Sequence, residues 1–217
     1  MLIANTKPKT NIENSGYYRL SGNKAIATLL RNCHATVIKN GNQLEDLVYE
    51  CVTLAKTKKH AFTGVEYPDA NSIMVVSQFE IKKEAISLDK GVNVDYVYFH
   101  KDKVFVCEIK DGDNFDTKKS SGEVDKLLIA AAALEVKDPH KREYIPKIVL
   151  WNCKDLSKSS FKDKRGRGML ITGREFAQMI NVDYEALNAK RKAEAPANTK
   201  YIIAEMKKIT EAYETIL

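Results

Sequence analysis

The chain has few of the residues that build zinc sites and disulfide frameworks. It holds four histidines and four cysteines among 217 residues, and no two cysteines form a CxxC pair. Zinc sites and small disulfide scaffolds need such groups at close, regular spacing. The sequence therefore indicates neither, and we expect the cysteines to be small buried side chains in a reducing compartment.

Long hydrophobic runs are also missing. The longest uncharged apolar run, LLIAAAAL at residues 127–134, is far shorter than the roughly 20 residues of a membrane span. The N-terminal residues MLIANTKPKT lack the apolar core of a signal peptide. We therefore expect a cytoplasmic protein without a membrane partner. The sequence also lacks a glycine-rich phosphate loop and a nucleophile elbow, which argues against a metabolic enzyme.

The composition that remains is typical of a globular protein. Hydrophobic residues make up 44% of the chain and charged residues 29%, which is enough apolar material for a sizeable core. We expect residues 1–217 to form a single domain. The net charge of +6 suits a polyanionic partner.

The order of patterned segments predicts a mixed sheet with helices around it. Apolar positions at helical spacing predict helices over residues 22–38, 41–56, 122–137, 174–180 and 199–217. A break at Lys39-Asn40-Gly41 separates the first two. Strand patterns cover residues 71–83, 94–110, 145–152 and 168–172. We predict an α/β (α+β) fold in which helical parts, about 20–60 and 174–217, flank a sheet with one antiparallel hairpin.

The last predicted helix carries a heptad-like seam. Its positions are Ile202, Met206, Ile209, Tyr213 and Ile216. Such a seam is more often a core face than an interface. If it is exposed, it would suit a homodimer with two-fold symmetry.

The hairpin at residues 94–110 contains two acids within otherwise apolar strands. If Lys101 and Asp102 form a two-residue turn, Asp95 faces Glu108, with Cβ atoms about 4.5 to 5.5 Å apart. Lys110 lies two residues beyond Glu108, so it projects from the same face. A three-residue loop would shift the register and separate the acids.

Two carboxylates at this distance repel each other. They share a proton, take a cationic partner or bind a divalent metal ion. Mg²⁺ fits because it prefers oxygen ligands and keeps room for water and phosphate. Lys110 could orient or help deprotonate a water and stabilise charge on phosphorus oxygens. The alternative is an ion pair on a solvated face, but the apolar strands indicate a sheet covered on both sides.

An acid in one strand followed by Glu-x-Lys in the next resembles the PD-(D/E)xK nuclease superfamily. Asp95, Glu108 and Lys110 occupy the motif positions, and the continuation EIKDGDNFDTKKSSGEVDKL resembles small type II restriction endonucleases. Val94 stands where many members have proline.

The resemblance implies a restriction-endonuclease-like fold and hydrolysis of double-stranded DNA. It also implies Mg²⁺, with Mn²⁺ as a substitute, held by Asp95, Glu108, Ile109 and an acid on an upstream helix. Two alternatives remain: a repair or recombination nuclease of the same superfamily, and a DNA-binding module without catalysis.

The upstream helix offers three acids, Glu45, Asp46 and Glu50. At about 100° per residue, Glu45 lies at the edge of the apolar stripe, whereas Asp46 and Glu50 point away from it. The stripe consists of Leu44, Leu47, Val48, Cys51, Val52 and Ala55. We expect Glu45 to complete the site; an ordinary surface acid is the equal alternative.

Basic residues follow the hairpin and a later strand. Those in the segments 111–122 and 154–168 suit contacts with phosphates or with guanine edges. A mobile, solvated loop is the alternative for the second segment. The expected DNA-binding residues are Lys118, Lys119, Ser120, Lys162, Lys164, Arg165 and Arg167.

Overall fold

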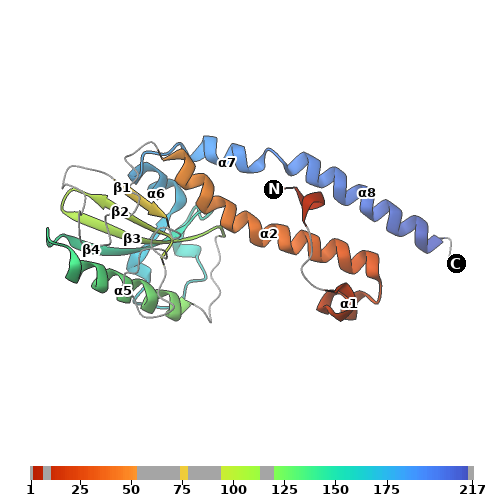
Figure 1. Ribbon diagram of the computed structural model, residues 1–217, viewed down its shortest axis with the longest axis horizontal. Helices are drawn as coiled ribbons and strands as arrows, with labels where there is room; N and C mark the ends of the chain where they lie inside the picture. The colour runs from red at the N-terminus through yellow and green to blue at the C-terminus, as the bar shows by residue number, and fades with distance from the viewer. Residues whose placement is uncertain (1, 7–10, 53–73, 78–93, 113–119, 215–217) are drawn as a thin grey trace. The chain divides into compact units, whose positions relative to one another are not determined.

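The computed structural model describes residues 2–6, 11–52, 74–77, 94–112 and 120–214 (Figure 1). Its helices are α1 (Gly16–Ser21), α2 (Lys24–Cys51), α5 (Ser120–Lys137), α6 (Gly173–Met179), α7 (Tyr184–Lys192) and α8 (Ala195–Glu214). Its strands are β1 (Met74–Ser77), β2 (Tyr96–His100), β3 (Lys103–Lys110), β4 (Glu143–Leu150) and β5 (Leu170–Thr172).

The chain divides into two compact units. Residues 1–44 and 188–217 form one unit, and residues 45–187 form the other. The expectation of a single nuclease domain stays a prediction. All five strands belong to the second unit.

The sheet combines both strand directions. Its order is β1-β2-β3-β4-β5, with antiparallel pairing from β1 to β3 and parallel pairing from β3 to β5. Helix α5 connects β3 to the parallel β4, as such a pair requires a crossover. The predicted fold class, a mixed sheet with an antiparallel hairpin flanked by helices, is confirmed.

The hairpin has the predicted register. His100 pairs with Lys103 and Tyr96 pairs with Cys107, so the turn contains two residues. Lys101 in that turn adopts a left-handed conformation with φ of 53°. The register therefore places Asp95 and Glu108 on the same side of the sheet.

One face of the sheet packs against α5. Val97 and Phe99 from β2 and Val104 and Val106 from β3 project into a core with residues of α5. The α5 residues in this core are Val124, Leu127, Ala130, Ala131 and Leu134. Because side chains alternate along a strand, the acids of the hairpin lie on this same face, at its end.

The opposite face packs against α6. Tyr96 and Tyr98 alternate with Val97 and Phe99, so they project from this second face. The Tyr98 hydroxyl donates a hydrogen bond to the Met179 carbonyl at 2.6 Å, and the ring of Tyr96 lies 6.3 Å from that of Phe176. Helices therefore cover both faces, which explains the near-continuous apolar character of the hairpin.

The predicted break at residues 39–41 is wrong, because α2 continues from Lys24 to Cys51. A Gly inside a helix costs only about 1 kcal/mol relative to Ala. Burial of Leu44, Leu47 and Val48 offsets this cost, at roughly 1.5 to 3 kcal/mol for each side chain. Residues 53–56 of the predicted helix lie outside the described residues.

The other predicted segments have counterparts. The segments 122–137, 145–152, 168–172, 174–180 and 199–217 correspond to α5, β4, β5, α6 and α8. Of the predicted strand 71–83, the described part is β1. Helices α1 and α7 were not predicted.

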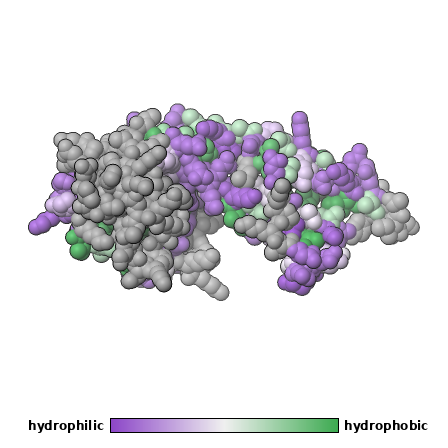
Figure 2. Space-filling model, viewed as in Figure 1, coloured by the Kyte–Doolittle hydropathy of each residue, from purple (hydrophilic) through white to green (hydrophobic). Residues whose placement is uncertain are grey.

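Part of the seam on α8 is exposed. Met206 is 56% exposed and its neighbour Ile203 is 61% exposed, while Ile202 and Ile209 are half-buried. Hydrophobic side chains are visible among hydrophilic ones on the surface in Figure 2. The homodimer stays a prediction. In the described part of the chain, no helix combines the length and the apolar character that crossing a bilayer requires.

A buried ion pair lies in the segment that connects α5 to β4. The Arg142 Nε donates to Asp138 Oδ2 at 2.7 Å, and both residues are 4% exposed. Tyr144 and the amide of His140 also donate to this carboxylate, at 3.1 Å and 2.9 Å. Burial raises the pKa of Asp138, but these hydrogen bonds outweigh burial and hold the pKa below its ordinary value.

We expect Asp138→Ala to lower the free energy of unfolding by roughly 3 to 5 kcal/mol at neutral pH, because it leaves Arg142 buried without this partner. A depressed pKa adds stability above the pKa of the unfolded state, which is lost as pH falls through that of the folded state. The difference between variant and wild type should therefore shrink below about pH 4. Chemical denaturation at several pH values measures it, with the exposed Asp46→Ala as control. A loss equal to that of the control would contradict the prediction.

Candidate active site

Asp95 lies just before β2 and is fixed by main-chain contacts with β3. Its amide donates to the Cys107 carbonyl at 3.0 Å, and its Oδ2 accepts a hydrogen bond from the Ile109 amide at 2.7 Å. The residue is 3% exposed. The β3 main chain therefore holds the carboxylate at the end of the α5 face.

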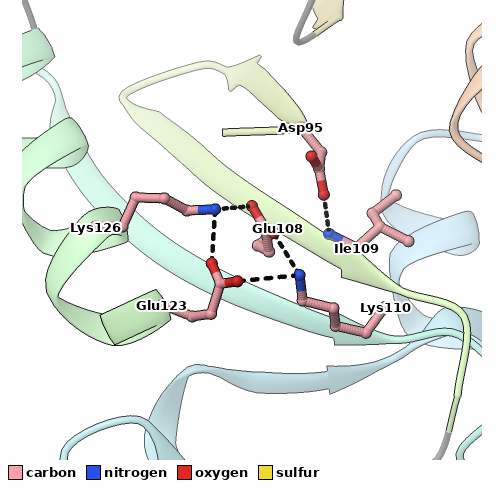
Figure 3. Close-up of polar contacts among 6 residues, drawn as sticks. All are labelled: Asp95, Glu108, Ile109, Lys110, Glu123 and Lys126. Carbon is pink, nitrogen blue, oxygen red and sulfur yellow. Dashed lines mark hydrogen bonds and ion pairs between the residues drawn. The ribbon is translucent and has the colours of Figure 1, made fainter. Parts of the chain in front are cut away.

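Glu108 and Lys110 come from β3 and contact each other directly. The Lys110 Nζ donates to Glu108 Oε1 at 2.5 Å. Glu108 is 4% exposed, and the side chain of Lys110 is 31% exposed. The structure thus brings Asp95, Glu108 and Lys110 together at one end of the hairpin (Figure 3).

Helix α5 adds Glu123 and Lys126, which were not predicted as site residues. The Lys126 Nζ lies 2.8 Å from Glu108 Oε2 and 2.6 Å from Glu123 Oε2. Lys110 lies 3.4 Å from Glu123 Oε1. The pattern of α5 contained a signal, because Glu123 precedes Leu127 by one turn and so falls on the apolar stripe.

These four side chains form a closed ring of alternating charge. Glu108, Lys110, Glu123 and Lys126 follow one another around it, and each carboxylate contacts both ammonium groups through different oxygens (Figure 3). We call this set the ion-pair ring. It neutralises the formal charge of Glu108 within the protein.

The carboxylates and ammonium groups shift one another's pKa values. Burial lowers the pKa of Lys110 and of Lys126, but their pairing with Glu108 and Glu123 outweighs burial and raises both. Burial raises the pKa of Glu123, and its contacts with the two lysines outweigh this and lower it. Both lysines are therefore held in the charged form.

Asp95 is in a different electrostatic position. Burial, followed by the negative charges of Glu108 and Glu45, raises the pKa of Asp95 to about 8. The Ile109 amide and the Lys110 ammonium act in the opposite direction. A divalent cation beside Asp95 would offset both the cost of burying its negative charge and the repulsion by the other carboxylates.

The donor set suits a hard divalent cation. Asp95 and Glu108 supply carboxylate oxygens, and Ile109 can contribute only its main-chain carbonyl, which are ligand types that Mg²⁺ accepts. Within the described ranges, no three His, Cys, Asp or Glu side chains are grouped closely enough to hold a metal ion. The pair of Asp95 and Glu108 therefore fits an ion that takes its remaining ligands from water and substrate.

Of the three acids considered on α2, Glu45 is associated with this site. Its negative charge acts on Asp95, and its main-chain carbonyl accepts a hydrogen bond from the Tyr96 hydroxyl. Glu45 is half-buried, whereas Asp46 and Glu50 are exposed. The position at the edge of the apolar stripe thus corresponds to proximity to Asp95.

The basic segment after β4 is not solvated along its whole length, because some of its residues pack against the core and α5. Phe161 is 1% exposed in the core, and a Cβ at Gly166 would come within 2.6 Å of Phe161 and Val124. The Arg165 guanidinium contacts Asp163 at 2.7 Å and Asp125 of α5 at 2.8 Å. Arg165 therefore ties the segment to α5.

The other expected DNA-binding residues fall into two groups. Lys162, Lys164 and Arg167 are exposed. Lys118 and Lys119 lie outside the described residues, and Ser120 begins α5, with its side chain also outside them.

The segments that leave β3 and β4 meet beside the site. The Asn152 amide nitrogen donates to the side chain of Asp111 at 2.9 Å and to its carbonyl. An open cavity of about 310 Å³ follows, lined by residues 152–155, Lys158 and Ser159. Its charged lining residues are Lys154, Lys158 and Asp155, and Lys158 lies 3.5 Å from Asp155 Oδ2.

No family model and no solved structure matches the chain. A curated relative, the type II restriction enzyme HhaII from Haemophilus parahaemolyticus, is 32% identical over 210 residues. The match covers 94% of this chain and 92% of the relative. Identity at this level over nearly the full length of both proteins shows that the chain belongs to the family of type II restriction enzymes.

Proposed function

We propose that this chain is a Mg²⁺-dependent, site-specific endodeoxyribonuclease of the PD-(D/E)xK type. The observation that carries the proposal is the gathering of Asp95, Glu108 and Lys110 on one buried face of the hairpin. The similarity to a type II restriction enzyme supports cleavage of double-stranded DNA at defined sites rather than repair or recombination.

In this proposal Asp95, Glu108, the Ile109 carbonyl and Glu45 hold the metal, and Mn²⁺ can replace Mg²⁺. The chemistry that a bound ion supplies is polarisation of the phosphodiester and activation of water. Asp95 is already oriented by the Ile109 amide, so the ligand needs little rearrangement.

Lys110 acts on the water and the phosphate. Its ammonium is charged, half-buried and held at the end of β3, where it can donate hydrogen bonds to oxygens of the substrate. Donors fixed before the reaction stabilise the charge that develops on phosphorus oxygens. This role needs Lys110 as a charged donor that orients the water, not as a neutral base.

The DNA backbone is proposed to contact the basic segments that follow β3 and β4 in the sequence. Lys162, Lys164 and Arg167 are exposed on the anchored segment after β4, and Lys118, Lys119 and Ser120 belong to the segment after β3. Arg165 would reach DNA only by exchanging its carboxylate partners for phosphate. Positive groups at these places would fix the duplex across Lys110.

A plasmid digest tests the function. Closed circular plasmid incubated with the protein and Mg²⁺ should give discrete fragments with common end sequences, and no cleavage in EDTA. Ragged degradation from linear ends would instead indicate an exonuclease. Binding of plasmid without any cleavage in Mg²⁺ or Mn²⁺ would indicate a module without catalysis.

Removal of the central acid or of the lysine should abolish this cleavage. We expect Asp95→Ala and Lys110→Ala to reduce the cleavage rate at least about a hundredfold while DNA binding is retained, because each loses an interaction with the transition state. Gel assays measure cleavage, and fluorescence anisotropy measures binding. Asp102→Ala and Lys103→Ala, exposed positions in the same hairpin, are matched controls. Full activity of Asp95→Ala would refute the assignment.

Glu45 should contribute to metal binding, whereas the neighbouring acid Asp46 should not. We expect Glu45→Gln to raise the Mg²⁺ concentration that gives half-maximal cleavage by roughly tenfold, because one negative charge near Asp95 is lost. The exposed Asp46→Asn removes the same charge one position along α2 and serves as control. Equal effects of the two variants would show that Glu45 has no special place in the site.

A further inference from the structure

The ion-pair ring places ammonium groups on both oxygens of Glu108. Lys110 contacts Oε1 at 2.5 Å, and Lys126 contacts Oε2 at 2.8 Å. Glu108 is 4% exposed, and a buried carboxylate charge is costly unless it has such partners. A divalent ion that uses Glu108 therefore meets a ligand whose positive partners are already in place.

The two lysines are held in different ways. Lys110 is on the same strand as Glu108, and its side chain is 31% exposed at the end of the site. Lys126 is on α5, with its side chain 20% exposed, and contacts Glu123 three positions earlier on the same helix at 2.6 Å. Lys126 can leave Glu108 and still keep a carboxylate partner.

Glu123 makes such an exchange possible. Its Oε2 contacts Lys126 and its Oε1 lies 3.4 Å from Lys110. An ammonium that lost Glu108 without another acceptor would become an uncompensated charge in a partly buried place, which is costly. With Glu123 in reach, the cost of displacing either lysine from Glu108 is reduced.

We propose that Lys126 is a built-in counterion that competes with the divalent metal for Glu108, and that Glu123 is the positioning residue that receives Lys126 when the metal binds. This inference rests on the proposed function, because it takes Glu108 as a metal ligand. It assigns roles to two side chains on α5, outside the hairpin motif. As a consequence, the affinity of the site for the metal ion is low while Lys126 contacts Glu108, and the ion exchanges rapidly. The affinity rises when Lys126 moves to Glu123.

Metal affinity without DNA tests the proposal directly. Titration calorimetry with Mn²⁺ should show Lys126→Met binding at least roughly tenfold more tightly than wild type, because a competing positive charge is removed beside a divalent ion. Lys126→Arg should return the affinity toward the wild-type value. A purely structural role would weaken binding or leave it unchanged, so tighter binding separates the two.

Glu123→Gln should have the opposite effect and weaken Mn²⁺ binding by a similar factor. Glu135→Gln removes the same charge from an exposed position of α5 and is the control for long-range electrostatics. In the Lys126→Met background the effect of Glu123→Gln should become smaller, because there is no displaced Lys126 to receive. Additive effects would contradict the exchange, since independent charges add.

The outcomes distinguish this inference from the nuclease assignment. If wild type binds Mn²⁺, Asp95→Ala loses it and Lys126→Met has unchanged or weaker affinity, the counterion role is overturned while the metal site stands. If neither wild type nor Lys126→Met binds Mn²⁺ in the absence of DNA, the counterion role is overturned, and the plasmid digest decides the nuclease assignment separately. Circular dichroism spectra and thermal unfolding of each variant verify that the fold is retained.

Discussion

Burial of the Glu108 carboxylate requires positive charge within the protein, and much of the surrounding structure meets that requirement. Helix α5 packs its apolar side chains on the hairpin and at the same time brings Lys126 and Glu123 to the carboxylate. The same helix receives Arg165 through Asp125. Packing and electrostatics are thus joined in one element, so the position of α5 determines both the core and the charge balance of the site.

The local geometry of the hairpin could be predicted from the sequence because it depends on short-range rules. A two-residue turn and the period of two along a strand were sufficient to pair Asp95 with Glu108 and to add Lys110. The helical angle also placed Glu45 nearer the apolar stripe than Asp46, and Glu45 is the less exposed of the two; its role in the site stays a prediction. These inferences needed no knowledge of how distant segments pack.

What could not be predicted depends on tertiary contacts. The approach of Glu123 and Lys126 to Glu108 arises only when the crossover helix lies against β3 and β4, and local sequence patterns contain no information about that packing. The continuity of α2 through Gly41 likewise reflects burial of the residues that follow, which overrides the local preference of glycine. The sequence pattern grouped Arg165 with the expected DNA-binding residues, whereas its ion pair with Asp125 depends on how the segment packs on α5.

The parallel pairing of β3 and β4 also governs where the chain goes after each strand. Because parallel strands run in the same direction, the chain leaves β3 at Asp111 and β4 at Trp151 at the same end of the sheet. A hydrogen bond from Asn152 to Asp111 links the two connections. Changes in the length or charge of either connection can therefore alter what surrounds Lys110 without disturbing the strands that carry it. Catalytic scaffold and substrate selection would be separable in such an arrangement, so that related enzymes could diverge in the sites they read while keeping the same chemistry.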